Sequence, residues 1–228
     1  MLHGYGLSLL QGAALTLAVA LSALAIALAL GLAGAVAKLS RSRLARAAAT
    51  LYTTAIRAVP DLVLMLLVFY GGQMGVNALG ERLGWAYIDI DPFVAGVLTI
   101  GFIFGAYFTE VLRGAFLAVP PGQAEAALAY GFSRAQVLWR IVGPQMLRHA
   151  LPGLSNNWLV MIKATAIVSV IGLSDLMNRA AQAAGTTREP FLFYGAVALM
   201  YLAFTSLSEL AFAWAARKLD IGTRRAAL

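Results

Sequence analysis

Five long apolar runs dominate the chain and predict five membrane-spanning helices. A helix needs about 20 apolar residues to cross about 30 Å of hydrocarbon, because it rises about 1.5 Å per residue. Only two of the runs contain a charged side chain, Lys163 in the fourth and Glu209 in the fifth. The runs cover residues 1–37, 62–80, 92–109, 151–173 and 190–216. This pattern is typical of an all-α integral membrane protein.

The charges between the runs predict an orientation in the membrane. Lysine and arginine gather in the first loop (within residues 38–46), in the later part of the third loop (within residues 134–148) and in the C-terminal tail (within residues 217–225). The second loop instead carries three acidic residues and one arginine, and the fourth loop is balanced. Because basic loops stay on the cytoplasmic side, the first loop, the third loop and the C-terminus are predicted to be cytoplasmic, and the N-terminus periplasmic.

The composition agrees with a membrane protein and excludes several other classes. The 228 residues are 61% hydrophobic and 12% charged, whereas a soluble domain carries about 25% charged residues. The net charge of +7 comes from short loops between apolar runs, which argues against a nucleic-acid groove. The absence of cysteine excludes disulfides and thiolate metal sites, and neither a metal site nor a catalytic site is predicted.

The third loop is the longest connection and has the strongest local signals. Pro120 and Pro121 are predicted to end the third helix, and residues 123–130 to form a short helix with Gly131 just beyond its end, where a left-handed conformation favours glycine. Ser133 and Gln136 then form a capping-box pattern that opens a second short helix, which we expect Pro144 to close. Val137, Leu138 and Ile141 should share one face of that second helix. A helix–glycine–helix unit of this kind either docks into a partner or merely connects two spans.

Six residues of this loop stand at a characteristic spacing and resemble a known motif. Glu125, Ala126, Ala127, Gly131, Ile141 and Pro144 together resemble the EAA loop of ABC importer permeases. Gly143 departs from the family pattern, which usually has leucine before the proline, and is expected to loosen the packing there.

The resemblance extends over nearly the whole chain. Residues 60–65 and 88–92 are similar, more narrowly, to the Q subunits of histidine/lysine/arginine/ornithine importers, with the Q subunits of arginine and opine importers as close relatives. The segments that resemble polar amino-acid permeases in general are residues 56–60, 69–71, 110–115, 119–123, 163–166 and 169–172.

The resemblance implies a fold and a set of partners. Residues 1–228 would form a single transmembrane domain with the type I ABC importer permease fold and cytoplasmic coupling helices. The loop of residues 120–144 would dock into a cleft of a separate ATPase through the six residues of the motif. The implied partners are a second permease subunit in a heterodimer, an ATPase dimer and a periplasmic amino-acid-binding protein, at the bacterial inner membrane and surrounded by lipid.

The resemblance also implies which component binds ATP. ATP and Mg²⁺ would bind to the partner ATPase, and this chain would hold no cofactor and perform no catalysis. The sequence agrees independently, because it lacks the G-x-x-x-x-G-K-[ST] motif that cradles ATP phosphates.

The implied cargo is a cationic or polar amino acid such as histidine, lysine, arginine or ornithine, and an opine is the alternative. A different class, an ion-driven secondary transporter, usually carries internal repeats, and none is evident in this chain.

Four charged residues near the predicted cytoplasmic ends of the second and third helices are candidates for a gate. Arg57 and Asp61 are four positions apart and Glu110 and Arg113 three apart, so each pair is predicted to share one helix face, at matching depth. The four charges either form a polar ring beneath the pore or pair locally and extend to the membrane surface.

Lys163 lies deeper in the membrane than these charges. It is about 18 Å along the fourth predicted helix, at about 1.5 Å per residue. There it could meet the α-carboxylate of a passing amino acid or pair with a carboxylate of a partner permease. Asn156 and Asn157 on the same helix could line the pathway or bond to neighbouring helices.

Overall fold

The computed structural model describes residues 2–219, which are almost entirely helical. Asp220, Arg224 and Arg225, which contributed to the charge pattern of the tail, lie outside the described residues. In chain order the elements are the short turn η1 (Leu2–Gly4), α1 (Gly6–Leu39), α2 (Arg43–Ala58), α3 (Asp61–Leu83), α4 (Pro92–Leu117), α5 (Pro121–Ala129), α6 (Arg134–Gln136), the π-helical η2 (Val137–Val142), α7 (Gly143–Ala164), the 3-10 segment η3 (Thr165–Ile171), α8 (Leu176–Thr187) and α9 (Pro190–Leu219).

Five helical segments of the described chain are long and apolar enough to cross a membrane, which confirms the predicted number. Four of them are α1, α3, α4 and α9, and the fifth is the continuous segment Arg134–Ile171. The helix α2, which the apolar pattern did not predict, is amphipathic and stands outside these five segments.

The fourth span begins earlier than its apolar run because the helix continues through Pro144. The prediction that Pro144 closes the cytoplasmic loop is wrong. This proline directly follows a π-helical turn, in which the Gly143 N–H donates to the Leu138 carbonyl five residues earlier, and the helix runs on past it as α7. The expected looseness at Gly143 is also wrong, since a β carbon there would lie 2.8 Å from the carbonyl oxygen of Leu138. The glycine allows the π-helical turn to pass tightly into α7.

The core of the fold is the packing of α1 against α4, the most extensive contact between two helices. Gly31 on α1 and Gly101 on α4 permit the close approach, because an added β carbon would lie 2.6 Å from the Phe108 side chain in the first case and 2.7 Å from the Ile26 side chain in the second. Small residues serve this purpose widely between membrane helices. Phe104 and Met161 are fully buried beside this contact and join α7 to it.

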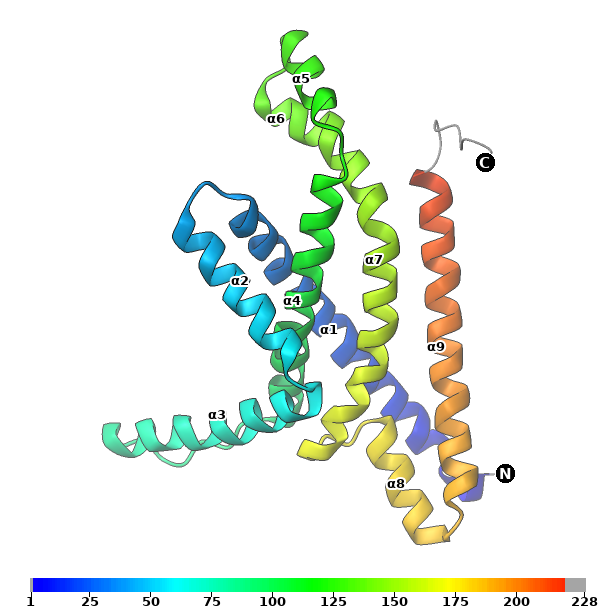
Figure 1. The fold of residues 1–228 in the computed structure, drawn as a ribbon. Coiled ribbons are helices and arrows are strands. Elements are labelled where there is room, and N and C mark those ends of the chain that lie inside the picture. The colour runs from blue at the N-terminus through cyan, green and yellow to red at the C-terminus, as the bar shows by residue number, and fades with distance from the viewer. Residues whose placement is uncertain (1, 220–228) are drawn as a thin grey trace.

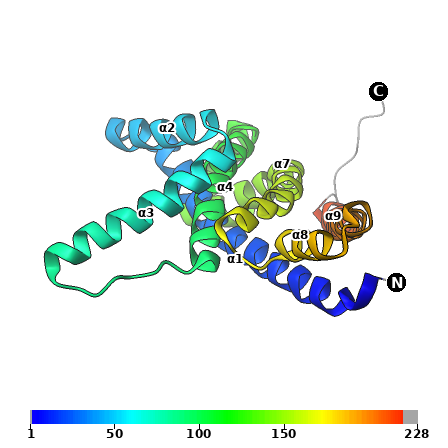
Figure 2. The same cartoon turned by 90° about the horizontal axis from the view of Figure 1, so that it is seen from below.

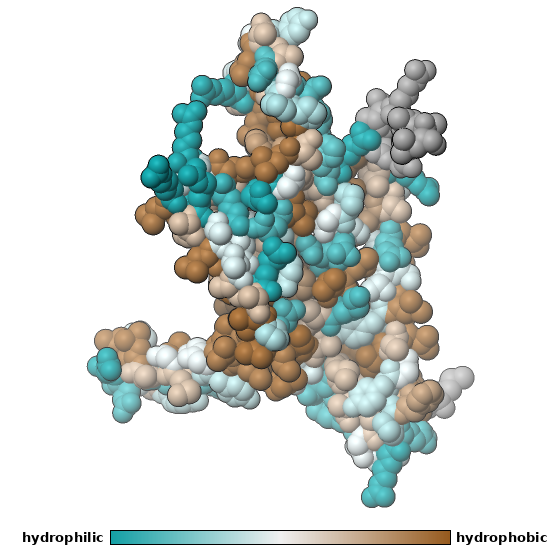
Figure 3. Space-filling view, in the orientation of Figure 1, coloured by the Kyte–Doolittle hydropathy of each residue, from teal (hydrophilic) through white to brown (hydrophobic). Residues whose placement is uncertain are grey.

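The loops with basic residues gather at one end of the bundle. Figure 1 shows α5 and α6, the α1–α2 connection and the end of α9 toward the top, while the N-terminus and α8 lie at the bottom. Apolar surface covers much of the bundle between these two ends, as Figure 3 shows. The predicted grouping of the first and third loops at one end therefore agrees with the arrangement of the helices.

The helix α3 projects sideways from the bundle (Figures 1 and 2). Only Met65 and Gly80 are buried along its whole length. The chain after α3 runs back beside it, and two side chains of α3 fix this return segment. Gln73 donates to the carbonyl of Ile88, and Asn77 both donates to that carbonyl and accepts from the Ile88 N–H.

Asp175 caps α8 in a buried position outside the membrane spans. Its Oδ1 accepts a hydrogen bond of 2.9 Å from the N–H of Asn178, whereas its Oδ2 is buried without a partner among the described residues. Asp175 is only 1% exposed. Burial raises the pKa of this carboxyl from 3.8 to about 6, since the charged form loses its hydration.

Asp175→Asn is expected to stabilise the protein above pH 6, because asparagine keeps the cap and removes the buried charge. The folded pKa lies above the unfolded value, so this carboxyl favours folding below pH 3.8 and loses that contribution as the pH rises through about 6. Thermal unfolding across this window should show a flatter pH dependence in the variant. Asp91→Asn is the matched control, because Asp91 caps α4 in the same way but is exposed. Equal pH dependence in the wild type and in Asp175→Asn would contradict the expectation.

Candidate coupling loop and membrane charge sites

The third loop folds into a compact helical hairpin. At the end of α5 the Gly131 N–H donates to the Leu128 carbonyl and the Phe132 N–H to the Ala127 carbonyl, with Gly131 in the left-handed conformation at φ 85°. These two bonds form a Schellman motif, as the position of Gly131 predicted. Ser133 and Gln136 form the predicted capping box at the start of α6. The hairpin is therefore fixed by its own caps.

The six motif residues divide between the surface and the interior of this hairpin. Glu125, Ala126 and Pro144 are exposed, Ile141 is half-buried and Ala127 is buried. Ala127 packs with Val119, Val137 and Val142 in a small apolar cluster inside the loop. The exposed Ala126 could therefore let a partner approach closely, because its side chain is small. The buried Ala127 packs inside the hairpin instead.

Two exposed aromatic residues of the hairpin were missed by the sequence analysis. Tyr130 is 86% exposed and Trp139 is 77% exposed. The prediction that Val137, Leu138 and Ile141 share one face is wrong, because Val137 is buried whereas Leu138 is 46% exposed in the π-helical segment, whose turn is wider than that of an α-helix. The π-helical turn, which periodicity alone does not reveal, decides where Leu138 and Trp139 lie.

Glu110 pairs with two cations rather than with one. Its carboxylate accepts a hydrogen bond of 3.0 Å from Arg113 and a second, short one from Lys38 on α1. Lys38 also donates to Thr53 on α2 at 2.7 Å. The side chains of Lys38 and Glu110 are 11% and 21% exposed, so this cluster is largely shielded and ties α1, α2 and α4 together. The sequence predicted the pair with Arg113 and missed Lys38.

Arg57 and Asp61 do not share a helix face, so that prediction is wrong. Pro60 separates α2 from α3, since a proline disfavours helical backbone in the residue before it. The Arg57 guanidinium lies 5.3 Å from the centre of the Tyr107 ring. Among the described residues neither Arg57 nor Asp61 forms an ion pair, so the four predicted charges do not form a ring in this structure.

Two polar side chains lie on one exposed face of α7, with the exposed Val160 between them. Lys163 and Asn156 are seven positions apart, hence on one helix face, and both are exposed. Asn157 is half-buried beside them. A lysine exposed on an otherwise apolar span requires water or a partner group at that depth.

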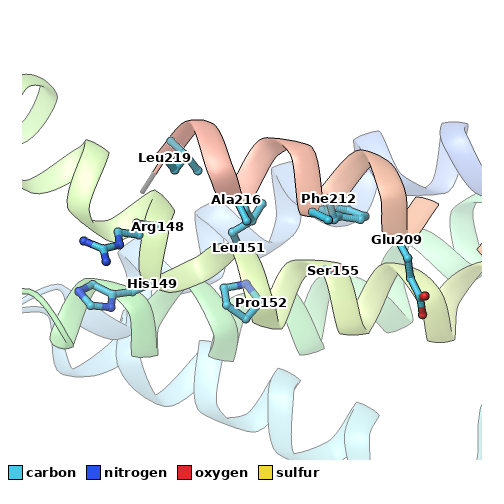
Figure 4. A pocket seen from close by; sticks show the side chains of 10 residues that line it. Arg148, His149, Leu151, Pro152, Ser155, Glu209, Phe212, Ala216 and Leu219 are labelled. Carbon is cyan, nitrogen blue, oxygen red and sulfur yellow. The ribbon is translucent and has the colours of Figure 1, made fainter. Parts of the chain in front are cut away.

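A groove of about 650 Å³ separates α7 from α9 (Figure 4). Arg148 and His149 line one end of it from α7, and Glu209 lies at the other end on α9. Pro152 and Phe212 form much of the apolar surface between them. Over the described residues no three histidine or acidic side chains cluster closely enough to hold a metal ion. The groove is therefore charged at its two ends and apolar between them.

The sequence model of one family, described as "Binding-protein-dependent transport system inner membrane component", matches residues 25–221. The chain belongs to this family. It is accordingly a transport permease component of the inner membrane rather than an ATPase, as the resemblance had implied.

Individual relatives support the same assignment. The chain is 50% identical to the histidine/lysine/arginine/ornithine transport system permease protein HisQ of Escherichia coli (strain K12) over 228 residues, which is 100% of both chains. It is 42% identical to the octopine transport system permease protein OccQ of Rhizobium meliloti over 223 residues, 97% of this chain and 94% of that one.

A solved structure shows that the fold is that of an amino-acid ABC permease. The crystal structure of an amino acid ABC transporter with histidines contains a chain that superposes with a TM-score of 0.80 at 31% identity, over 94% of this permease and 95% of that chain. The predicted all-α permease fold with five spans is thereby confirmed.

Proposed function

We propose that this permease forms half of the translocation pathway of an ATP-driven importer for cationic and polar amino acids of the histidine, lysine, arginine and ornithine class. The observation that carries the proposal is the 50% identity to HisQ over the entire length of both chains. An opine importer is the alternative, supported by the 42% identity to OccQ.

The third loop is proposed as the element that couples this chain to the ATPase. The hairpin stands at one extremity of the molecule (Figure 1) and carries an exposed carboxylate at Glu125 next to the small side chain of Ala126. Tyr130 and Trp139 add large exposed apolar surface, and aromatic residues commonly anchor protein interfaces. A surface of this kind suits insertion into a groove of a soluble partner that binds ATP and Mg²⁺.

The exposed face of α7 that carries Lys163 and Asn156 is proposed as part of the pathway. Lys163 and Asn156 occupy an exposed face of a membrane span, and Asn157 lies beside them. A cation at this depth suits the α-carboxylate that every amino acid carries. Arg57 and Asp61 at the α2–α3 junction, together with Glu110 and Arg113, remain candidates for the gate.

The second permease subunit is proposed to cover the face that this chain leaves open. The helix α3 has little contact with the rest of the chain, and Leu67 and Met74 on it are among its exposed apolar side chains. A heterodimer with a related permease, an ATPase dimer and a periplasmic binding protein would complete the importer.

Transport by the assembled complex tests the proposed function. The permease, co-expressed with its neighbouring transport subunits and reconstituted in vesicles, should take up radiolabelled arginine or histidine with ATP and not with a non-hydrolysable analogue. An ATPase subunit should co-purify with it. Uptake driven by an ion gradient without ATP would identify a secondary transporter, and competition by octopine but not by arginine would identify an opine importer.

The orientation is proposed from the charge of the loops, with the first and third loops and the C-terminus cytoplasmic. Reporter fusions that are active only in the periplasm should give activity when placed after Asp91 and none when placed after Ser40 or after Gly131. A cytoplasmic signal after Asp91 would contradict the five-span orientation.

A further inference from the structure

A basic cavity of about 800 Å³ opens between α2, the end of α1 and α4. Four cations line it, namely Lys38, Arg43, Arg46 and Arg113. The acidic group that contacts these cations is Glu110, which pairs with Lys38 and Arg113. Four cations against one carboxylate leave an excess of three positive charges. Like charges at this density repel each other, so the cavity favours an anion.

Two arginines of this cavity are positioned by the start of α2 and by a hydrogen bond to the backbone, rather than by an ion pair with an acidic residue. Arg43 is the first residue of α2, whose N-cap Ser42 accepts from the N–H of Ala45. Arg46 donates to the carbonyl of Ser40 at 3.1 Å, which holds its guanidinium near the α1–α2 connection. Figure 3 shows hydrophilic surface gathered where α2 begins. Guanidinium groups are well suited to a phosphate, since each presents two parallel donors to its oxygens.

Apolar side chains lie around the cavity, and they indicate what kind of molecule carries the anion. Leu44 and Leu51 on α2 are 81% and 71% exposed beside the arginines. Leu39 and Leu112, the sequence neighbours of Lys38 and Arg113, line a separate apolar groove of about 680 Å³. An amphipathic helix with exposed leucines next to arginines is typical of one that lies at a membrane surface.

We propose that this cavity binds the phosphate of an anionic phospholipid, with an acyl chain lying against the neighbouring leucines. Basic pockets between membrane helices on the cytoplasmic side commonly bind anionic headgroups. A free phosphate ion would satisfy the arginines but would leave Leu44 and Leu51 uncovered. The site is distinct from the proposed amino-acid pathway along α7 and from the third loop, and it shares Arg113 with the gate candidates.

Native mass spectrometry of the intact complex tests the site, with phosphatidylglycerol as the probe and zwitterionic phosphatidylethanolamine as the comparison lipid. Arg43→Gln and Arg46→Gln should each weaken phosphatidylglycerol binding about fivefold, and the double variant about thirtyfold. Phosphatidylethanolamine binding should change little. Arg41→Gln is the matched control, because it removes the same charge from the α1–α2 connection. Arg41 is exposed there but does not line the cavity.

Three results would overturn the proposal. Unchanged phosphatidylglycerol binding in the double variant would show that the cavity is not the binding site. An equal loss in Arg41→Gln would mean that general surface charge, rather than this site, attracts the lipid. Displacement of the lipid by millimolar inorganic phosphate would identify a free anion as the occupant. Co-purification of the other subunits with each variant verifies that the complex stays assembled.

Discussion

Gly131→Val is expected to weaken the coupling between the permease and the ATPase while leaving the complex in the membrane. Gly131 holds the Schellman turn at φ 85°, and a left-handed conformation costs a residue with a β carbon about 1–2 kcal/mol. Nothing lies within 4 Å of an added β carbon, so the cost comes from the backbone alone. The strained turn should displace α5, and uptake and the stimulation of the ATPase by loaded binding protein should both fall about tenfold, which corresponds to about 1.4 kcal/mol.

Gly84→Val is the matched control for this effect. Gly84 ends α3 in the same left-handed conformation, at φ 71°, and also has open space around an added β carbon. Equal uncoupling in both variants would show that backbone strain anywhere impairs the transporter, and full uptake by Gly131→Val would make the loop a mere connector.

Glu125→Lys tests the same surface by charge. Glu125 is exposed, so the substitution should leave the fold intact and place the wrong sign at the docking surface. Glu81→Lys, an equally exposed change on the opposite side of the membrane by the predicted orientation, should transport normally.

Glu110→Gln is expected to destabilise the complex by about 2 kcal/mol. It leaves Lys38 and Arg113 without their carboxylate, and breaking an ion pair costs about 3–5 kcal/mol when the pair is buried and about 0–1 kcal/mol when it is exposed. Since the lysine side chain is 11% exposed and the arginine side chain 37%, the expected loss lies between these two ranges, at about 2 kcal/mol. Thermal unfolding of the purified complex measures the loss. A second substitution, Lys38→Met, should restore part of the stability. It removes the ammonium group of Lys38, which is the less exposed of the two cations that Glu110→Gln leaves without a carboxylate.

The contact between His3 and Glu189 provides the control for Glu110→Gln. Its side chains are 54% and 48% exposed, and an exposed ion pair contributes only about 0–1 kcal/mol. Glu189→Gln should therefore unfold almost as the wild type does. Equal stability of Glu110→Gln and Glu189→Gln would mean that the Glu110 cluster does not hold α1, α2 and α4 together.

A gating role for the Glu110 cluster predicts a further change besides stability. Variants that remain assembled should hydrolyse ATP without the loaded binding protein, since the contact among the three helices would no longer restrain the closed state. A tight dependence of the ATPase on loaded binding protein in Glu110→Gln would assign the cluster to structure alone.

Much of the architecture follows from the sequence by itself. The length and spacing of the apolar runs determine five spans, because each backbone polar group in lipid must be satisfied within a helix. The caps of the third loop are equally local, so Gly131 and the Ser133–Gln136 pair were predicted correctly. The motif of that loop likewise indicated the family.

What only the tertiary structure decided are the relations between helices. Arg57 and Asp61 are near in sequence but separate in space, because Pro60 starts a new helix in a new direction. Lys38 reaches Glu110 across 72 positions of sequence, a contact that depends on how closely α1 approaches α4. The buried site of Ala127 and the exposure of Trp139 depend on the π-helical turn after the capping box. Local periodicity encodes which residues form helices, whereas the partners of each charge depend on packing between segments far apart in the chain.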